Sequence, residues 1–242
     1  TFARGTRFAL VPTTLLSQAD ACLGGKTGVN YRGFKNMVGA FKQPEFVLSD
    51  QTLLSTLPKE TYCDGLAEVV KHACIADLSF FEFLEANNRR ILEREQGVLE
   101  ELVIKSLLIK ASFVEKDAFE KNERMKLNFW HTFAHAIEKC SRDYSHGESV
   151  AIGMCLANAF SVERGMLSEN EATRVKQILT EFNLPTSAQG LRAGDLFDAM
   201  AVDKKKQGEQ LRLVLLNKIG SAEVVEVQVD LLKKFLEKQL GE

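Results

Sequence analysis

The sequence predicts a small α/β segment followed by a mainly α-helical domain. Glycine and β-branched residues are frequent in the first fifty positions, whereas long segments of helical period follow Pro58. The size of the chain fits a folded protein, because 242 residues with 45% hydrophobic and 26% charged side chains can bury a core. We therefore expect a boundary near Pro58 that separates residues 1–57 from residues 58–242.

Two short buried strands are expected in the first segment, at residues 8–11 and 46–48. Both runs are apolar, and they end at Pro12 and Asp50. Between them lies a glycine-rich stretch in which lysines stand next to glycines, at residues 24–28 and 33–36. Because glycine has no Cβ, its backbone can approach a ligand closely. The stretch is therefore suited to a loop that contacts a phosphate or a nucleotide.

The second segment is predicted to be helical over most of its length. Apolar residues recur at helical spacing in residues 66–75, 99–119, 125–140 and 150–162. Near the end, residues 211–216 and 223–227 predict two short strands around a turn at Gly220. A final amphipathic helix is expected from Asp230, with its charges on a solvated face.

Composition excludes several classes of protein. Lysine and arginine number 31 against 33 aspartate and glutamate, which gives a net charge of −2 and argues against a dedicated nucleic-acid binder. No apolar run approaches the ~18 residues of a membrane helix, and no signal peptide is visible. The five cysteines include no Cys-x-x-Cys pair, so free thiols in a reducing cytoplasm are expected. The first residue is Thr, which predicts a fragment of a longer protein.

Three of the four histidines fall within sixteen positions, at His131, His135 and His146. His131 and His135 are four apart on a predicted helix and therefore share one face. Zinc sites use this spacing, and a catalytic zinc commonly has three protein ligands. The glutamate of the metalloprotease motif His-Glu-x-x-His is absent. Two interpretations stay open: a metal site, or histidines that cap or hydrogen-bond within a helical bundle.

Three further groups of polar residues are candidates for a catalytic or binding site. Glu68 and Lys71 are three apart on a mostly apolar helix, which predicts either a buried site or an ordinary surface ion pair. Arg124 and Asn128 lie on one stripe with His131 and could hold a carboxylate or a phosphate. The charged run at residues 203–206 is typical of an exposed loop.

Six motifs, taken in order, resemble those of the 3-dehydroquinate synthase family of shikimate-pathway enzymes. They lie at residues 12–18, 24–27, 35–41, 65–71, 127–138 and 146–148. The resemblance implies that residues 1–57 are the α/β remnant of a Rossmann-like nucleotide-binding domain. It implies that residues 58–242 are a mainly α-helical metal- and substrate-binding domain, so that the fold is dehydroquinate synthase-like.

The activity implied by the resemblance is the conversion of 3-deoxy-D-arabino-heptulosonate 7-phosphate to 3-dehydroquinate and phosphate. The implied cofactors are NAD and Zn²⁺, or Co²⁺ in its place. The implied partner is a small phosphorylated sugar acid, with no nucleic acid and no membrane. In this family Arg4 would reach the phosphate bound to a neighbouring subunit, which implies a homodimer.

The resemblance also assigns residues to roles. The implied metal ligands are Glu68, His131 and His146. The implied catalytic residues are His135, Lys71, Lys110 and Asp20. Substrate contacts are implied for Arg4, Lys26, Asn36, Arg124, Asn128, and one of Lys204 and Lys205. NAD contacts are implied for Thr13, Thr14, Lys26, Lys35, Leu53, Leu54, Ser55 and Thr56.

The sequence departs from the family in two ways. The family's N-terminal nucleotide-binding half, with its Gly-Gly-Gly turn, would precede Thr1, so we expect weak NAD binding in this chain. Phe129 and Trp130 stand where the family usually has Leu-Gly, and the bulk of Trp130 is expected to reshape the pocket. The alternatives are another sugar phosphate cyclase, an iron- or zinc-dependent polyol dehydrogenase, and an inactive zinc-binding fragment.

Overall fold

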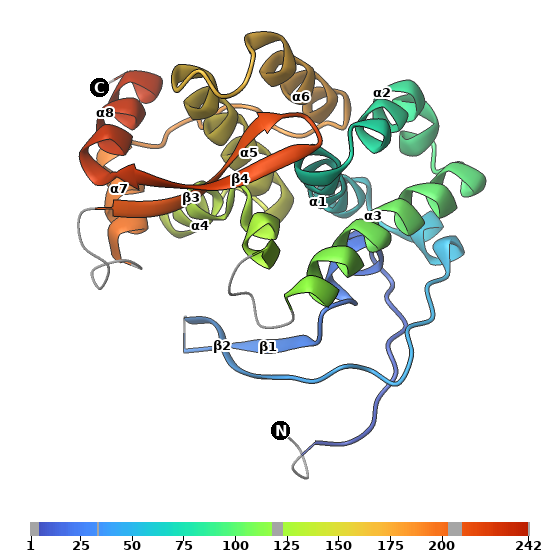
Figure 1. Ribbon diagram of the computed structural model, residues 1–242. Helices are drawn as coiled ribbons and strands as arrows, with labels where there is room; N and C mark the ends of the chain where they lie inside the picture. Colours follow the sequence, from blue (N-terminus) through green and yellow to red (C-terminus); the bar gives the residue numbers. More distant parts are fainter. Residues whose placement is uncertain (1–4, 33, 118–122, 203–209, 242) are drawn as a thin grey trace.

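The computed structural model describes residues 5–32, 34–117, 123–202 and 210–241, without the side chains of residues 30, 34–36, 131, 201 and 202. A helical body carries one hairpin across its surface, and a second hairpin extends away from it (Figure 1). The helices of these ranges are α1 Lys59–Ala76, α2 Leu78–Leu92, α3 Gln96–Lys116, α4 His131–Cys140, α5 His146–Glu163, α6 Glu169–Glu181, α7 Ala193–Val202 and α8 Val229–Leu240. The strands are β1 Lys26–Tyr31, β2 Phe34–Phe41, β3 Gln210–Lys218 and β4 Ser221–Gln228.

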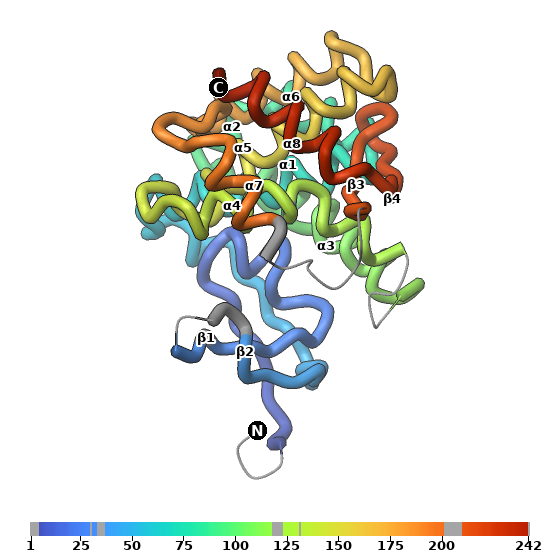
Figure 2. The backbone as a smooth tube through the Cα atoms, turned by 90° about the vertical axis from the view of Figure 1, so that its left-hand side faces the viewer, coloured from blue at the N-terminus to red at the C-terminus, as the bar shows by residue number. Residues whose placement is uncertain are grey.

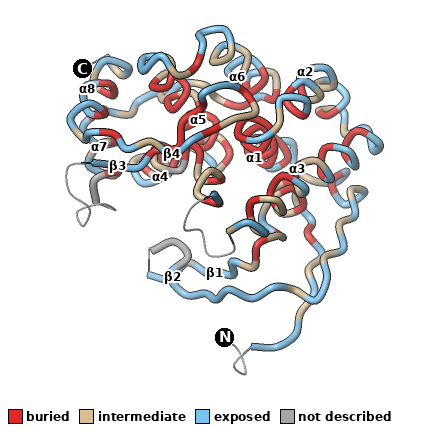
Figure 3. The backbone as a smooth tube through the Cα atoms, in the orientation of Figure 1, coloured by how far each residue is buried: buried red, intermediate tan, exposed pale blue. Residues whose placement is uncertain are grey.

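Helix α1 runs through the centre of the helical body. Its residues are buried almost continuously from Tyr62 to Ile75, and a helix that is apolar on most faces is stable only inside a core. Figure 3 shows α1 and α5 as the most buried helices. Helix α1 ends where Asp77 becomes extended and accepts a hydrogen bond from the Phe80 amide at 3.0 Å, which caps α2.

Helix α5 begins at His146 and packs against α1 and α4. Ser145 and Glu148 form a capping box: the Ser145 hydroxyl accepts from the Glu148 amide, and the Glu148 carboxylate accepts from the Ser145 amide at 2.8 Å. Helices α4 and α5 approach closely at Gly153, where a Cβ would lie 3.1 Å from the Ala134 nitrogen. The start of α5, and therefore His146, is thus fixed against α1.

The continuous helix predicted over residues 125–140 is wrong. The structure has a short 3₁₀ helix, Glu123–Asn128, then a turn, and only then α4. The interruption lies at Trp130, whose φ of 78° is left-handed and cannot continue a right-handed helix. His131 and His135 nevertheless share α4, as predicted.

The two strands predicted in the first segment form a minimal pair. Leu10 and Val47 make an isolated parallel bridge, with hydrogen bonds of 3.1 Å from the Leu10 amide to the Phe46 carbonyl and 2.9 Å from the Leu48 amide to the Leu10 carbonyl. Their predicted burial is wrong, since Phe46 is 61% exposed and Leu48 57%. The reason is that, in the described residues, no further strand pairs with this bridge and no helix covers both faces.

The glycine-rich stretch forms the antiparallel hairpin β1–β2 rather than an open loop. The hairpin projects from the helical body, on the side where the chain begins (Figure 2). Gly39 pairs with Gly28, and a Cβ on Gly39 would lie only 1.8 Å from the Thr27 carbonyl oxygen. Glycine is therefore used here for the close approach of two strands.

The C-terminal strands and helix agree with the prediction. Strands β3 and β4 pair antiparallel around the turn at Gly220, whose amide donates to the Cys74 carbonyl of α1 at 2.8 Å. Helix α8 buries Leu232, Phe235 and Leu236 and leaves its charges outside. The mixed fold class, a small strand-containing segment followed by a mainly helical domain, is confirmed.

Two expectations about composition can be compared with the structure. The five cysteines are free thiols, as expected. Over the described ranges, no helix combines the length and the apolar character that a membrane crossing needs.

The turn at Gly220 generates a stability prediction. Its φ is +86°, and a Cβ would lie 2.6 Å from the Leu78 backbone nitrogen, which cannot move without disturbing the start of α2. We expect Gly220→Ala to lower the free energy of unfolding in urea by about 3 kcal/mol. Gly165→Ala is the matched control, because its φ is +69° but no atom lies near the added Cβ, and it should cost about 1 kcal/mol. Equal losses would contradict the docking of the turn on α2.

Candidate metal and substrate site

The site begins with a helical turn that presents Asp20 to the helical body. This turn, Ser17–Ala21, is anchored at its start: the Ser17 and Thr14 hydroxyls lie 2.9 Å apart, and the buried Gln18 side-chain amide donates to the Asp50 carbonyl at 2.8 Å. The turn packs on α1 and α3. Asp20 therefore reaches into the gap between these two helices.

Four charged side chains alternate in sign across that gap. The Lys110 Nζ lies 3.0 Å from Asp20 Oδ2, and the Lys71 Nζ lies 3.6 Å from Asp20 Oδ1. Lys71 also pairs with Glu68 Oε2 at 2.8 Å. The Lys71 and Glu68 side chains are only 3% and 5% exposed, so their pair is a buried one and not the surface ion pair that their spacing alone allows. Buried charges are tolerated when they are paired in this way.

The pairing sets the charge of each group. Burial raises the pKa of Asp20, but Lys71 and Lys110 lower it well below its ordinary value. Burial also raises the pKa of Glu68, whereas Lys71 and His146 lower it to about 2. Burial lowers the pKa of Lys71, but Glu68 and Asp20 outweigh this effect and raise it. For Lys110, burial prevails and lowers the pKa, which suits a side chain that holds or releases a proton.

Glu68 and His146 bring two donor atoms together at the end of this cluster. Glu68 Oε1 lies 3.2 Å from His146 Nε2, and Glu138 Oε1 lies 3.0 Å from His146 Nδ1. Ligand atoms bound at about 2.1 Å to a tetrahedral zinc are about 3.4 Å apart, so the two donors fit a zinc ion. The Glu138 carboxylate is placed as the outer partner that orients a metal-binding imidazole.

The third implied ligand cannot be placed, because the side chain of His131 lies outside the described residues. His131 begins α4, which packs against α5. Within the described part of the chain, no three His, Cys, Asp or Glu side chains form a metal cluster. Burial lowers the pKa of His146, but its hydrogen bonds to Glu138 and Glu68 outweigh burial and raise it to about 10.

Trp130 lies between two of the implied site histidines. Its ring meets the His146 ring edge-on, with centroids 5.7 Å apart, and the His135 ring at 6.3 Å. Trp130 is 2% exposed and is held in the left-handed backbone conformation that favours glycine. Its bulk therefore packs against the imidazole rings from within the protein.

The implied substrate residues lie on elements around the cluster. Arg124 is buried, and its Nη2 donates to the Gly24 carbonyl at 3.3 Å. Gly24 has a φ of +101°, which L side chains rarely adopt, and a Cβ there would lie 2.6 Å from that nitrogen. Lys26 is exposed at the start of β1, while Asn128, at the end of the 3₁₀ helix, is half-buried. Arg4, Lys204, Lys205 and the side chain of Asn36 lie outside the described residues.

The implied NAD residues lie in the first segment, and some of them form hydrogen bonds with other residues of the chain. Thr13 is exposed, and Thr14 bonds to Ser17. Residues 53–56 belong to the 3₁₀ helix Gln51–Thr56, and the carbonyls of Leu54 and Ser55 accept from Arg94 Nη1 at 2.7 and 2.9 Å. The side chain of Lys35 lies outside the described residues.

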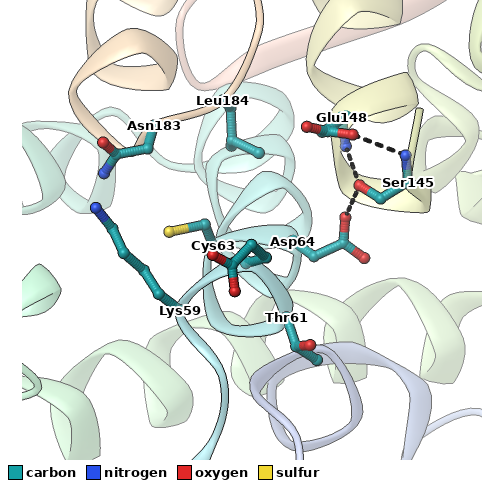
Figure 4. A pocket seen from close by; sticks show the side chains of 9 residues that line it. Lys59, Thr61, Cys63, Asp64, Ser145, Glu148, Asn183 and Leu184 are labelled. Atoms are coloured by element: carbon teal, nitrogen blue, oxygen red, sulfur yellow. Dashed lines mark hydrogen bonds between the residues drawn. The ribbon is translucent and has the colours of Figure 1, made fainter. Parts of the chain in front are cut away.

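Sequence reasoning missed Asp64, one helical turn before Glu68 on α1. Asp64 Oδ1 accepts from the Gly147 amide and from the Ser145 hydroxyl, each at 2.5 Å, so it holds both neighbours of His146 (Figure 4). A Cβ on Gly147 would lie 2.3 Å from the Asp64 carbonyl oxygen. Asp64 and Gly147 are 83 positions apart, and no pattern in the sequence connects them. Helix α1 thus carries Glu68 and also the clamp that holds His146.

Comparisons with solved structures identify the fold. The fold is shared with 2-epi-5-epi-valiolone synthase from Streptomyces hygroscopicus, solved with NAD⁺ and Zn²⁺, at a TM-score of 0.89 and 27% identity over 99% of this chain and 68% of that one. A 2-deoxy-scyllo-inosose synthase solved with carbaglucose-6-phosphate, NAD⁺ and Co²⁺ has a TM-score of 0.86 and 26% identity over 98% and 68%. The fold is that of the sugar phosphate cyclases.

The family follows from the sequence matches. Residues 1–64 match the family described as 3-dehydroquinate synthase N-terminal, and residues 65–206 match 3-dehydroquinate synthase C-terminal. The 3-dehydroquinate synthase of Halorhodospira halophila is 46% identical over 93% of this chain, and that of Acinetobacter baumannii (strain AYE) is 44% identical over 96%. The chain belongs to the 3-dehydroquinate synthase family. It spans 64% and 66% of the length of these two relatives.

The clamp at Asp64 generates a prediction about metal affinity. We expect Asp64→Ala to weaken Zn²⁺ binding by roughly 10- to 100-fold, because both neighbours of His146 lose their anchor. Isothermal titration with Zn²⁺, in competition with a chelator, measures this. Asp77→Ala is the matched control, since Asp77 caps α2 and should cost stability without changing affinity. An equal loss of affinity in both variants would show that the clamp is not specific.

The position of Trp130 provides a second test. Trp130 is the only tryptophan of the chain, so its fluorescence reports on this site alone. We expect Co²⁺ to quench it in a saturable manner, because the ring contacts His146. Glu68→Gln should abolish saturable quenching, whereas Glu60→Gln, at the exposed start of α1, should leave it unchanged. Saturable quenching that survives in Glu68→Gln would place the metal elsewhere.

Proposed function

We propose that this protein is a 3-dehydroquinate synthase, which converts 3-deoxy-D-arabino-heptulosonate 7-phosphate to 3-dehydroquinate and phosphate. The observation that carries the proposal is the contact between two candidate metal donors, Glu68 and His146, and the buried ammonium groups of Lys71 and Lys110. A Lewis acid beside two cations suits a substrate that is both a polyol and a phosphorylated acid. The relatives that bear this name are 44–46% identical to the chain.

The cofactors in this proposal are NAD and Zn²⁺ or Co²⁺, which are bound in the two solved cyclases. The metal would supply Lewis-acid polarisation of a substrate oxygen, and NAD would supply reversible hydride transfer, so that the overall reaction would be neutral in redox terms. Glu68, His146 and His131 would hold the metal. The NAD contacts would come from the first segment, at Thr13, Thr14, Lys26, Lys35 and residues 53–56.

The residues of the chain orient the substrate and move its protons. Lys71, Lys110 and Arg124 neutralise its carboxylate and phosphate, which holds a flexible sugar in one arrangement and makes elimination and ring closure effectively unimolecular. Lys26, Asn36, Asn128 and one of Lys204 and Lys205 complete these contacts. Asp20 keeps the two lysines in place. His135 relays a proton at a substrate oxygen.

The proposal also includes the assembly of the protein and its location in the cell. The protein would be a homodimer, in which Arg4 of one subunit reaches the phosphate bound by the other. It would act in the cytoplasm, where its free thiols stay reduced.

Another sugar phosphate cyclase is the second candidate. The solved cyclases match in fold, but at 26–27% identity they are more distant than the 3-dehydroquinate synthases. A probable glycerol dehydrogenase from Sinorhizobium meliloti has a TM-score of 0.64 and 14% identity, which supports a shared fold alone.

Phosphate release tests the proposal. The 242-residue chain and the complete product of its gene are each incubated with the heptulosonate phosphate, NAD and Zn²⁺. We expect release by the gene product, and a loss of about 100-fold or more in kcat/KM in Lys71→Met. Lys105→Met is the matched control, because Lys105 pairs with Glu101 at the surface of α3 and should leave turnover unchanged.

Each rival has its own outcome in the same assay. Phosphate release from glucose 6-phosphate but not from the heptulosonate phosphate would favour another cyclase. Accumulation of NADH with glycerol and no phosphate release would favour a dehydrogenase. Zn²⁺ binding without turnover in the chain, together with turnover in a longer gene product, would identify the chain as an inactive zinc-binding fragment.

A further inference from the structure

Three polar side chains lie in a line that leads to the site, and two of them, His72 and Ser106, are fully buried. His72 follows Lys71 on α1 and is fully buried. Its Nδ1 lies 2.6 Å from the hydroxyl of Ser106 on α3, and its Nε2 lies 3.1 Å from Asp20 Oδ1. Ser106 is also fully buried, and its Oγ lies 3.2 Å from the Ala19 carbonyl oxygen. The line Ser106–His72–Asp20 therefore ends on the carboxylate that both lysines share.

The protons along this line can be assigned from the chemistry of its members. Burial and the nearby charge of Lys71 lower the pKa of His72 to about 4, although Asp20 acts in the opposite direction. The imidazole is thus neutral at neutral pH and has one N–H. Asp20 is ionised and can only accept a hydrogen bond. The N–H must therefore be on Nε2, and Nδ1 accepts from the Ser106 hydroxyl, whose other acceptor, Ala19, is further away.

This arrangement is not a hydrolytic triad. In such a triad the carboxylate bonds to Nδ1 and the serine to Nε2, and the serine faces the substrate. Here the order is reversed, and the serine is enclosed. A nucleophilic role for Ser106 is therefore excluded, and a role in orientation is left.

We propose that His72 is a positioning residue of the site: its Nε2–H, with Nε2 3.1 Å from Oδ1, fixes the rotation of the Asp20 carboxylate by electrostatic attraction, and Ser106 selects the tautomer that turns an N–H toward it. With Oδ1 held by His72, Oδ2 faces Lys110 at 3.0 Å, while Lys71 at 3.6 Å from Oδ1 is left closer to Glu68. Without the His72 donor, Oδ1 is free to rotate toward Lys71, and the position of both ammonium groups changes. The effect on turnover rests on the proposed function, whereas the tautomer does not.

The first test measures the tautomer directly. The chain has only four histidines, so ¹⁵N-labelled imidazole signals are assigned to His72 by their loss in His72→Gln. We expect a protonated Nε2 and an unprotonated Nδ1 in the wild-type chain, and a mixture of tautomers in Ser106→Ala. Ser112→Ala is the matched control, because the Ser112 hydroxyl donates to the Ile109 carbonyl of its own helix, at 2.8 Å. A protonated Nδ1 in the wild type overturns the proposal.

The second test measures turnover. We expect His72→Leu to lower kcat for phosphate release by roughly 10- to 100-fold, because misplaced side chains lose catalytic geometry. His72→Gln keeps an amide N–H that can reach Asp20 and should recover most of this loss. Ser106→Ala, a small change, covers the case in which His72→Leu does not fold. Equal kcat in His72→Leu and His72→Gln overturns the positioning role. If the wild type releases no phosphate, the proposed function fails, and the ¹⁵N measurement still decides the tautomer.

Discussion

The mutual neutralisation of buried charges is the constraint on which the site depends. Asp20, Glu68, Lys71 and Lys110 are two anions and two cations, and each contacts a group of opposite sign. The removal of one member would leave a charge stranded in the core, which is far more costly than the loss of a surface ion pair. The surrounding structure serves this pairing: the Ser17–Ala21 turn, α1 and α3 must meet at one place for Asp20 to contact both lysines.

Helix α1 organises the site because this one helix contacts both the start of α5 and the turn that carries Asp20. Glu68 faces His146 of α5, Lys71 and His72 face Asp20, and Asp64 holds the start of α5. These positions are related by helical spacing, so a rigid, buried helix fixes their relative geometry without help from loops. The site residues on α3 and α5 are then positioned by the packing of these helices against α1, and those on α4 by its packing against α5. The capping box at Ser145 and the clamp at Asp64 do this for His146.

The sequence could predict what depends on local spacing and could not predict what depends on packing. The helical period, the shared helix of His131 and His135, the final hairpin and the Glu68–Lys71 pair are local features, and the structure has them. The burial of that pair depends on neighbours far along the chain, since Lys110 is 90 positions from Asp20. The break at Trp130 was missed because a left-handed tryptophan has no signature in hydrophobic periodicity. The exposure of Phe46 was also missed, because an apolar run predicts a strand but does not show whether another strand or a helix covers that strand.

Several residues with an unfavourable backbone conformation or an unfavourable environment lie around the candidate site. Trp130 has a backbone conformation that costs a non-glycine residue free energy, and it lies against His146 and His135. Gly24 is left-handed against Arg124, and Asp20 is an ionised carboxylate in the core. These unfavourable conformations and buried charges are retained only where the surrounding packing holds them in place, and such strain is typical of functional sites. A cation held between Glu68 and His146 would compete with Lys71 for the Glu68 carboxylate. Lys71 and Lys110 would then face Asp20 as two cations against one anion, an imbalance that an anionic substrate would correct.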